Sequence, residues 1–189
     1  KRLIYIIAII IIVLFGYLFY SELEKKEKTE LANRYNLAIT KFTSGEKSNV
    51  VNELKDIIEE KNATYSPLAL YFLMDNGLIN SNEEINRYFD LILNETNLEE
   101  ELINLILFKK ALFNSDFETE DKLLNIIKPL MNSDSVWKSH SLYLMAEYFF
   151  SKGEKQKSRE FYDQIIKLEN SNPNIKLEAQ KRIRRDFSE

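Results

Sequence analysis

The sequence contains no cysteine and has only one histidine, three prolines and four glycines among its 189 residues. Without cysteine, the chain has no disulfide, thiolate metal site or cysteine nucleophile. A single histidine excludes metal sites that need several imidazole ligands, so we expect neither a metal nor a cofactor. The scarcity of glycine and proline argues against turn-rich sandwiches. The net charge is −4, whereas nucleic-acid-binding domains are usually basic, so we expect no nucleic-acid partner.

Apolar residues are concentrated near the N-terminus. Residues Leu3 to Tyr20 form an uncharged run of 18 residues. A helix of this length measures about 27 Å, close to the thickness of the bilayer hydrocarbon core. The run has no polar face, and no small-residue cleavage pattern follows it. We therefore interpret residues 1–21 as an uncleaved transmembrane anchor that contacts the lipid bilayer through residues 3–20.

From Glu22 onward the sequence predicts only helices, separated by short breaks. Ser66-Pro67 predicts an N-cap followed by proline at the first helical position. Ser81 and Glu84 have the spacing of a capping box. The other expected breaks are Ser44-Gly45-Glu46, Asn76-Gly77, Asn97 with Glu100, Asn114-Ser115-Asp116, Lys128-Pro129, Lys152-Gly153 and Asn172-Pro173.

The predicted helices fall into pairs. The first members of the pairs begin near Glu30, Ser66, Leu98 and Ser135, which gives spacings of 36, 32 and 37 residues. A two-helix unit of about 34 residues is the tetratricopeptide period. The last predicted helix, from Asn174 to Phe187, is amphipathic, as expected of the capping helix that repeat arrays need.

One internal repeat is more specific than the spacing. Ala38 followed by Gly45-Glu46-Lys47 recurs as Ala146 followed by Gly153-Glu154-Lys155, with the same offset of seven. Leu37 then corresponds to Met145, and Phe42 to Phe150. We predict an all-α chain in which residues 22–189 form a tetratricopeptide-like α-solenoid of about four helix pairs with a C-terminal capping helix.

Solenoids of this type commonly bind peptides or helices on the concave side, which is lined by the first helix of each pair. A partner-binding groove is therefore expected here. Consensus spacing predicts that the groove is lined by Tyr35, Ile39, Phe42, Leu70, Leu73, Met74, His140, Tyr143, Glu147 and Phe150.

Catalysis has little support in the sequence. Ser139-His140-Ser141 places hydroxyls beside the lone imidazole, but adjacent residues on a helix point in different directions. No Gly-x-Ser-x-Gly elbow surrounds either serine. No combination of nucleophile, base and orienting group is present. We therefore predict that the protein is not an enzyme.

Several motifs carry a family resemblance. They are Lys1-Arg2 before the apolar run, Lys61 to Ala69, Asn97-Leu98 with Ile103-Asn104-Leu105, Trp137, Ala146 to Arg159, and Pro173 before a terminal amphipathic helix. With these motifs, nearly the whole chain resembles the ancillary subunit of the SecYEG translocon. Members of that family are bitopic bacterial inner-membrane proteins with a tetratricopeptide-like periplasmic domain.

The resemblance implies a location and partners. It places the protein in the bacterial inner membrane as a single-pass protein, with residues 22–189 in the periplasm. The implied partners are Sec translocon subunits, a membrane-anchored prolyl-isomerase-like chaperone, and unfolded or newly exported polypeptides. The implied function is that of a non-catalytic, membrane-anchored scaffold of the export machinery, which assists newly translocated proteins.

Two other interpretations fit the same residues. Lysines follow the apolar run at positions 25, 26 and 28 as well as preceding it, so charge alone does not decide the topology. The second interpretation, which ranks below the first, is a membrane-anchored cytosolic tetratricopeptide adaptor, such as an organelle import receptor. The third interpretation is an envelope-assembly scaffold, which predicts stable stoichiometric complexes.

Overall fold

The computed structural model describes the backbone of residues 2–187 and the side chains of residues 10–187 other than residue 24. Within these residues the chain is all-helical and contains no strand. Contacts divide the chain into two units, residues 1–97 and residues 98–189. The predicted fold class is confirmed at the level of an all-α chain.

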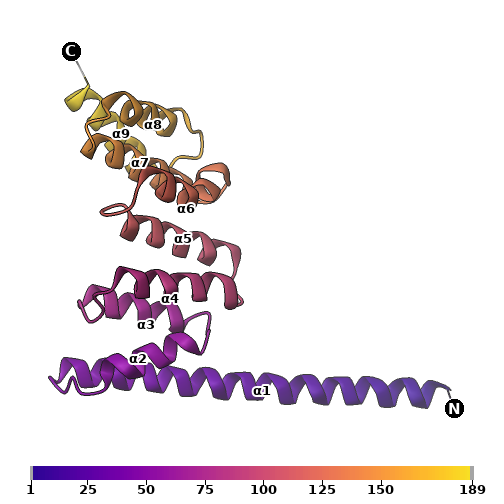
Figure 1. Cartoon of the computed structure of the whole chain (residues 1–189). Helices are drawn as coiled ribbons and strands as arrows, with labels where there is room; N and C mark the ends of the chain where they lie inside the picture. Colours follow the sequence, from indigo (N-terminus) through magenta and orange to yellow (C-terminus); the bar gives the residue numbers. More distant parts are fainter. Residues whose placement is uncertain (1, 188–189) are drawn as a thin grey trace. The chain divides into compact units, whose positions relative to one another are not determined.

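Unit 1 contains four helices, which Figure 1 draws from indigo to magenta. In this unit α2 packs against α1, α3 and α4, and α3 packs against α1 and α4. Its fully buried side chains come mainly from α2, α3 and α4. The helices are α1 (Arg2–Thr43), α2 (Val50–Glu59), α3 (Tyr65–Asp75) and α4 (Asn82–Glu95).

Unit 2 contains five helices, and α7 is its centre. One face of α7 joins a buried cluster with α6, and the other joins a buried cluster with α8 and α9. Each helix thus packs against helices that are near neighbours in the sequence. The helices are α5 (Glu100–Asn114), α6 (Glu120–Asn132), α7 (Lys138–Ser151), α8 (Lys155–Lys167) and α9 (Pro173–Asp186).

Several helix ends lie where the sequence predicts them. The Ser81 hydroxyl accepts a hydrogen bond from the backbone N–H of Glu84 at 3.2 Å, which caps α4. The Asn172 side chain accepts from the N–H groups of Asn174 and Ile175, and Pro173 occupies the first turn of α9. These ends depend on side chains within three residues, so local sequence determines them.

The start of α3 differs from the prediction. Asn62 supplies the capping oxygen, which accepts from the N–H groups of Thr64 at 3.0 Å and Tyr65 at 3.1 Å. Ser66 is fully buried inside α3 instead. Its hydroxyl donates to the Ile57 carbonyl at 3.0 Å and accepts from the Asn62 N–H at 2.9 Å. The expected N-cap is therefore a link between α2 and α3.

The expected break at Lys128-Pro129 is also wrong, because α6 continues through Pro129 to Asn132. Pro129 lies in the last turn, where its missing N–H removes a single intrahelical hydrogen bond. Ile127 and Leu130 are fully buried on either side of it. Their packing against α7 keeps the last turn helical.

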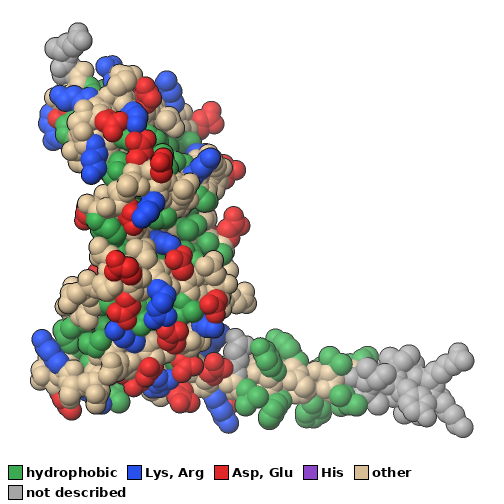
Figure 2. All heavy atoms as spheres, in the orientation of Figure 1, with side chains coloured by type: hydrophobic (Ala, Val, Ile, Leu, Met, Phe, Trp, Pro, Cys, Tyr) green, Lys and Arg blue, Asp and Glu red, His purple; other side chains and the backbone are tan. Residues whose placement is uncertain are grey.

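The expected transmembrane anchor lies in the first half of α1. The side chains of residues 3–9 fall outside the described residues. Figure 2 shows that residues 10–20 carry exposed apolar side chains. Residues 10–20 measure about 16 Å along a helix, roughly half of the hydrocarbon core. Among the residues whose side chains are described, none of the helices combines the length and apolarity that a membrane crossing requires.

This finding contradicts the predicted single-pass location in a bacterial inner membrane, and with it the periplasmic placement of residues 22–189. The boundary expected between residues 21 and 22 falls inside α1, which continues without interruption from Arg2 to Thr43. The first helix of the expected repeat and the expected anchor are thus parts of one helix.

Candidate interaction surfaces

The predicted groove residues of α1 contact α3. Tyr35, Ile39 and Phe42 are half-buried. The ring of Tyr35 lies 5.8 Å from that of Tyr65, and the ring of Phe42 lies 5.2 Å from that of Phe72, at 87°. Edge-to-face contact of this kind is favourable for aromatic pairs. Burial raises the pKa of Tyr35 above its ordinary value. These rings therefore bind two first helices together and leave only part of their surface accessible.

The predicted groove residues of α3 are less accessible still. Leu70 and Leu73 are fully buried, and Met74 is half-buried. The helix α3 packs against α1, α2 and α4, so little of its surface is left for a partner. Leu70 and Leu73 are core residues in the structure, which corrects their assignment to a groove.

At the start of α7, His140 belongs to an aromatic cluster. Its ring lies 5.2 Å from Trp137 and 6.0 Å from Phe108 of α5, and these two rings stack 5.4 Å apart. The Nδ1 atom of His140 is buried and has no hydrogen-bond partner among the described residues. The imidazole packs as an aromatic ring between α5 and α7, and no serine hydroxyl bonds to it there.

Further along α7, Glu147 is held by α9. The Arg182 guanidinium donates from Nε and Nη2 to the two carboxylate oxygens of Glu147, both at 2.8 Å. It also pairs with Asp186 at 2.7 Å, and its Nε donates to the Tyr162 hydroxyl at 3.0 Å. The Tyr162 hydroxyl in turn donates to Glu147. We call Glu147, Tyr162, Arg182 and Asp186 the α9 clamp.

The α9 clamp extends to the neighbouring rings. The guanidinium carbon of Arg182 lies 4.4 Å from the centre of the Phe150 ring, which Phe187 also contacts at 5.9 Å. Tyr143 lies 5.7 Å from Tyr162. Burial, assisted by the charge of Glu147, raises the pKa of Tyr143 to about 12. The predicted groove residues Tyr143, Glu147 and Phe150 are therefore in contact with α8 and α9.

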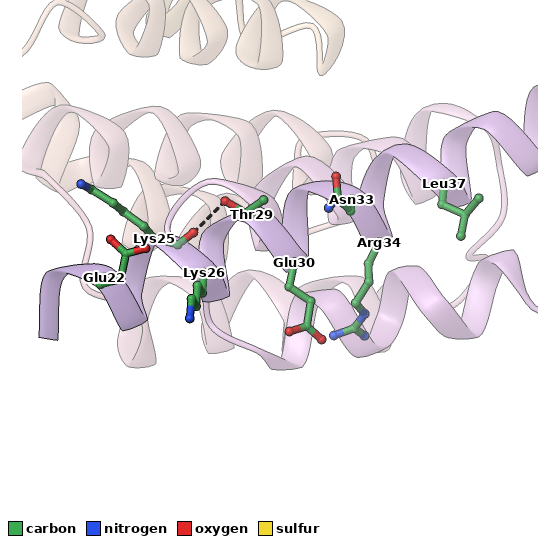
Figure 3. Close-up of a pocket in the computed structure, with 8 residues that line it drawn as sticks. All are labelled: Glu22, Lys25, Lys26, Thr29, Glu30, Asn33, Arg34 and Leu37. Carbon is green, nitrogen blue, oxygen red and sulfur yellow. Dashed lines mark hydrogen bonds between the residues drawn. The ribbon is translucent and has the colours of Figure 1, made fainter. Parts of the chain in front are cut away.

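The described residues of unit 1 include two open surfaces, and the first is a shallow hollow on α1. Figure 3 shows the residues that line it, all of which come from this one helix. The hollow has a volume of about 470 Å³. The Thr29 hydroxyl donates to the Lys25 carbonyl at 2.7 Å within it. The lining residues are Glu22, Lys25, Lys26, Thr29, Glu30, Asn33, Arg34 and Leu37.

The second open surface is a notch between α1 and the start of α2, with a volume of about 350 Å³. Ala38 and Val50 are buried in it, whereas Leu37 is 56% exposed. Arg34 donates to the carboxylates of Glu53 at 2.7 Å and Glu60 at 3.1 Å, and the bond to Glu53 raises its pKa. We call this surface the α1–α2 notch. It is lined by Arg34, Leu37, Ala38, Lys41, Ser48, Asn49, Val50 and Glu53.

The sequence analysis missed both the notch and the α9 clamp. The signal for the notch is the match of Leu37 to Met145 in the internal repeat. Met145 is fully buried, so an apolar side chain at the equivalent but exposed position 37 calls for an explanation. The signal for the clamp is weaker. Arg182 belongs to a run of basic residues whose pattern indicates a solvated face.

Among the side chains that the structure describes, no three Asp, Glu or His groups are arranged to hold a metal ion. The main features of the described residues are half-buried rings, the bidentate ion pair of Glu147 and Arg182, and the two hollows on unit 1.

No family model, curated protein or solved structure matches this chain. The resemblance to the translocon subunit therefore stays a prediction from sequence motifs.

Proposed function

We propose that this protein is a non-catalytic helical-repeat scaffold that binds segments of other proteins. In this proposal the chain is a tetratricopeptide-like solenoid of four helix pairs, α1–α2, α3–α4, α5–α6 and α7–α8, capped by α9. Repeat arrays pack mainly between neighbouring repeats and present long surfaces to partners. Binding, rather than a reaction, is what such surfaces support.

The observation that carries the proposal is a turn that ends the first helix of three pairs, at Gly45, Gly77 and Gly153. Gly45 and Gly153 both have positive φ, at 87° and 78°. The N–H of Gly45 donates to the Phe42 carbonyl at 3.1 Å, and that of Gly153 donates to the Phe150 carbonyl at 3.0 Å. The next N–H also bonds in the same way in both, from Glu46 at 2.9 Å and from Glu154 at 2.9 Å. The two Gly-Glu-Lys segments that match in sequence therefore also have the same backbone conformation and hydrogen bonds.

Contacts between successive first helices support the same proposal. Phe42 of α1 contacts Phe72 of α3 edge-on, and Phe150 of α7 contacts Phe187 just after α9 in a similar way. The equivalent residues Phe42 and Phe150 thus join α1 to α3 and α7 to the end of α9. This is the packing that a solenoid requires, because each repeat must bury its apolar face against the next.

The proposed clients are unfolded or newly exported polypeptides. This part of the proposal comes from the resemblance to the translocon subunit, as does an association with Sec translocon subunits and a prolyl-isomerase-like chaperone. Cross-linking in the native host, followed by purification of the chain, tests these named partners. Recovery of neither Sec subunits nor the chaperone would contradict them.

The scaffold function is tested with a purified client. The probe is a fluorescently labelled protein that has been reduced and S-alkylated, so that it stays unfolded. We expect saturable binding by fluorescence anisotropy, with the client recovered chemically unchanged. The same protein in its folded, disulfide-bonded form is the control and should not bind. Equal binding of both forms, or of neither, would contradict the proposed client class.

A further inference from the structure

Six of the eight residues that line the α1–α2 notch correspond to residues of α7–α8 that are buried or half-buried. The internal repeat relates the two surfaces by a constant offset of 108 positions, as between Gly45 and Gly153. The corresponding pairs are Arg34 and Leu142, Leu37 and Met145, Ala38 and Ala146, Lys41 and Phe149, Val50 and Ser158, and Glu53 and Phe161.

On α7–α8 this surface is filled by a helix. Met145 and Phe149 belong to a buried cluster with Leu123, Ile127 and Leu130, all three of which come from α6. Met145 is fully buried as a result, whereas its counterpart Leu37 is 56% exposed. In the internal repeat, the notch is therefore the equivalent of a surface on which a helix packs.

The notch differs from its counterpart in polarity. Phe149, which is buried against α6, corresponds to the cationic Lys41, and Leu142, which is buried against α8 and α9, corresponds to the cationic Arg34. Arg34 is neutralised by Glu53 at 2.7 Å. Lys41 makes no ion pair with any side chain that the structure describes. The notch thus combines an apolar floor with one unpaired positive charge at its rim.

On the covered surface, the packed helix forms an ion pair with a lysine at the edge. Lys157 of α8 donates to both carboxylate oxygens of Glu120 of α6, each at 3.0 Å. The helix that fills the surface on α7–α8 therefore contributes leucine and isoleucine side chains to the centre and a carboxylate to the edge. A helix for the notch needs the same two features, with the carboxylate placed for Lys41.

We infer that the α1–α2 notch seats an acidic amphipathic helix of a partner protein, with an apolar side chain on Leu37 and a carboxylate at Lys41. The inference rests on the proposed scaffold function, because it names the partner of one of its surfaces. It goes beyond that proposal because it names the binding site and the chemistry of the partner.

The test uses the full chain and a peptide derived from α6. The peptide has the sequence of Glu120–Asn132, is stapled to hold it helical, and carries Lys122→Glu and Lys128→Glu. Its control carries Glu120→Lys and Asp121→Lys instead. We expect the acidic peptide to bind more tightly than the basic one. Binding is followed by fluorescence anisotropy of a labelled peptide.

Three variants of the chain locate the binding. Leu37→Glu should weaken binding of the acidic peptide roughly tenfold or more, because a charge would then be buried under the bound helix. Lys41→Glu should weaken binding of the acidic peptide about fivefold and strengthen binding of the basic peptide. Leu177→Glu on α9, where the leucine is 46% exposed, is the matched control and should change nothing. Circular dichroism and the urea midpoint check that each variant folds.

The outcomes separate this inference from the scaffold function. Suppose that the unfolded client binds, but that the acidic helix either does not bind or binds equally well to the Leu37→Glu variant. The notch assignment is then wrong, and the scaffold function stands. If Leu37→Glu removes a concentration-dependent dimer of this chain, the occupant is a second copy and the inference is overturned. If the helix binds at the notch and the unfolded client does not, the inference stands and the client class is wrong.

Discussion

The pairs α1–α2 and α7–α8 have the same turn and the same matched phenylalanine, but they differ in what covers their first helix. On α7 the side chains on both faces are buried, by α6 on one side and by α8 and α9 on the other. On α1 the counterparts of Met145 and Phe149, which face α6, are the exposed Leu37 and the cationic Lys41. A local motif therefore determines the turn, while the neighbouring helix determines which residues its faces can carry.

The two pairs also differ in how the next first helix is attached. Helix α1 meets α3 through the aromatic pairs of Tyr35 and Phe42. Helix α7 meets α9 through a phenylalanine pair and, in addition, through the bidentate ion pair of Glu147 and Arg182. Among the described residues of α9, Ala179 is fully buried and Ile175 and Ile183 pack against the same cluster, so the ion pair adds to an apolar contact.

The comparison predicts its largest effect at a matched pair of positions, Phe149 and Lys41. Phe149→Ala should lower the free energy of unfolding by about 3–5 kcal/mol, because it opens a cavity between α6, α7 and α8. Lys41→Ala should change it by less than about 0.5 kcal/mol, since nothing covers that face. Urea unfolding followed by circular dichroism measures both. Similar losses in the two variants would mean that the α1 face is covered after all.

The α9 clamp provides the next largest effect. Arg182→Ala should cost about 1.5–3 kcal/mol, because it removes several hydrogen bonds to charged partners and leaves Glu147 without its cation. Arg34→Ala should cost less than about 1 kcal/mol, because its ion pairs are more exposed to solvent. Hydrogen exchange of α9 in the first variant, and of α2 in the second, localises each loss.

A conservative variant sharpens this prediction. Arg182→Lys keeps the charge but has a single ammonium in place of the two-pronged guanidinium. It should recover less than half of the loss caused by Arg182→Ala. Full recovery by lysine would show that α9 is held by charge alone and that the bidentate geometry contributes nothing.

Sequence reasoning succeeded where the determinant is local. The turn at Gly45, the cap at Ser81 and the start of α9 at Asn172 each depend on residues within a single turn of chain. It failed where packing between helices determines the position of a residue. Ser66 has the residue type and position of an N-cap, but a carbonyl of α2 and the core around it place it inside α3.

The candidate surfaces were less predictable for the same reason. Periodicity shows which side chains share a helix face, but it does not show which helix packs on that face. Leu70 and Leu73 therefore had the spacing of groove residues and proved to be core. The α9 clamp joins residues 35 positions apart, and no local pattern links Glu147 to Arg182.

The two equivalent glycines should respond to substitution alike. A Cβ added at Gly45 or Gly153 would meet nothing within 4 Å, so the positive φ is the main cost of a side chain at either position. Gly45→Ala and Gly153→Ala should each lower the free energy of unfolding by about 1 kcal/mol, and asparagine should cost less than alanine. Unequal losses, measured by urea unfolding, would show that the turns are equivalent in geometry but not in energy.

The smallest predicted effect concerns the matched tyrosines, Tyr35 and Tyr143. Burial raises the pKa of both, and at Tyr143 the charge of Glu147 contributes as well and brings the pKa to about 12. The counterpart of Glu147 beside Tyr35 is the uncharged Ile39. Because a raised pKa favours the protonated folded form, the stability due to Tyr143 is complete below pH 10, the ordinary tyrosine pKa, and is lost as the pH rises towards 12.

Removing the charge at position 147 tests this account. Glu147→Gln should lower the pKa of Tyr143, because the phenolate then forms without a carboxylate beside it. The measurement is tyrosinate absorbance during an alkaline titration, with Tyr143→Phe in each background to isolate this one phenol. Ile39→Gln is the matched control and should leave the titration of Tyr35 unchanged. A titration of Tyr143 that is the same with glutamate and glutamine would leave burial as the common cause at both positions, and the electrostatic difference between the two helix pairs would disappear.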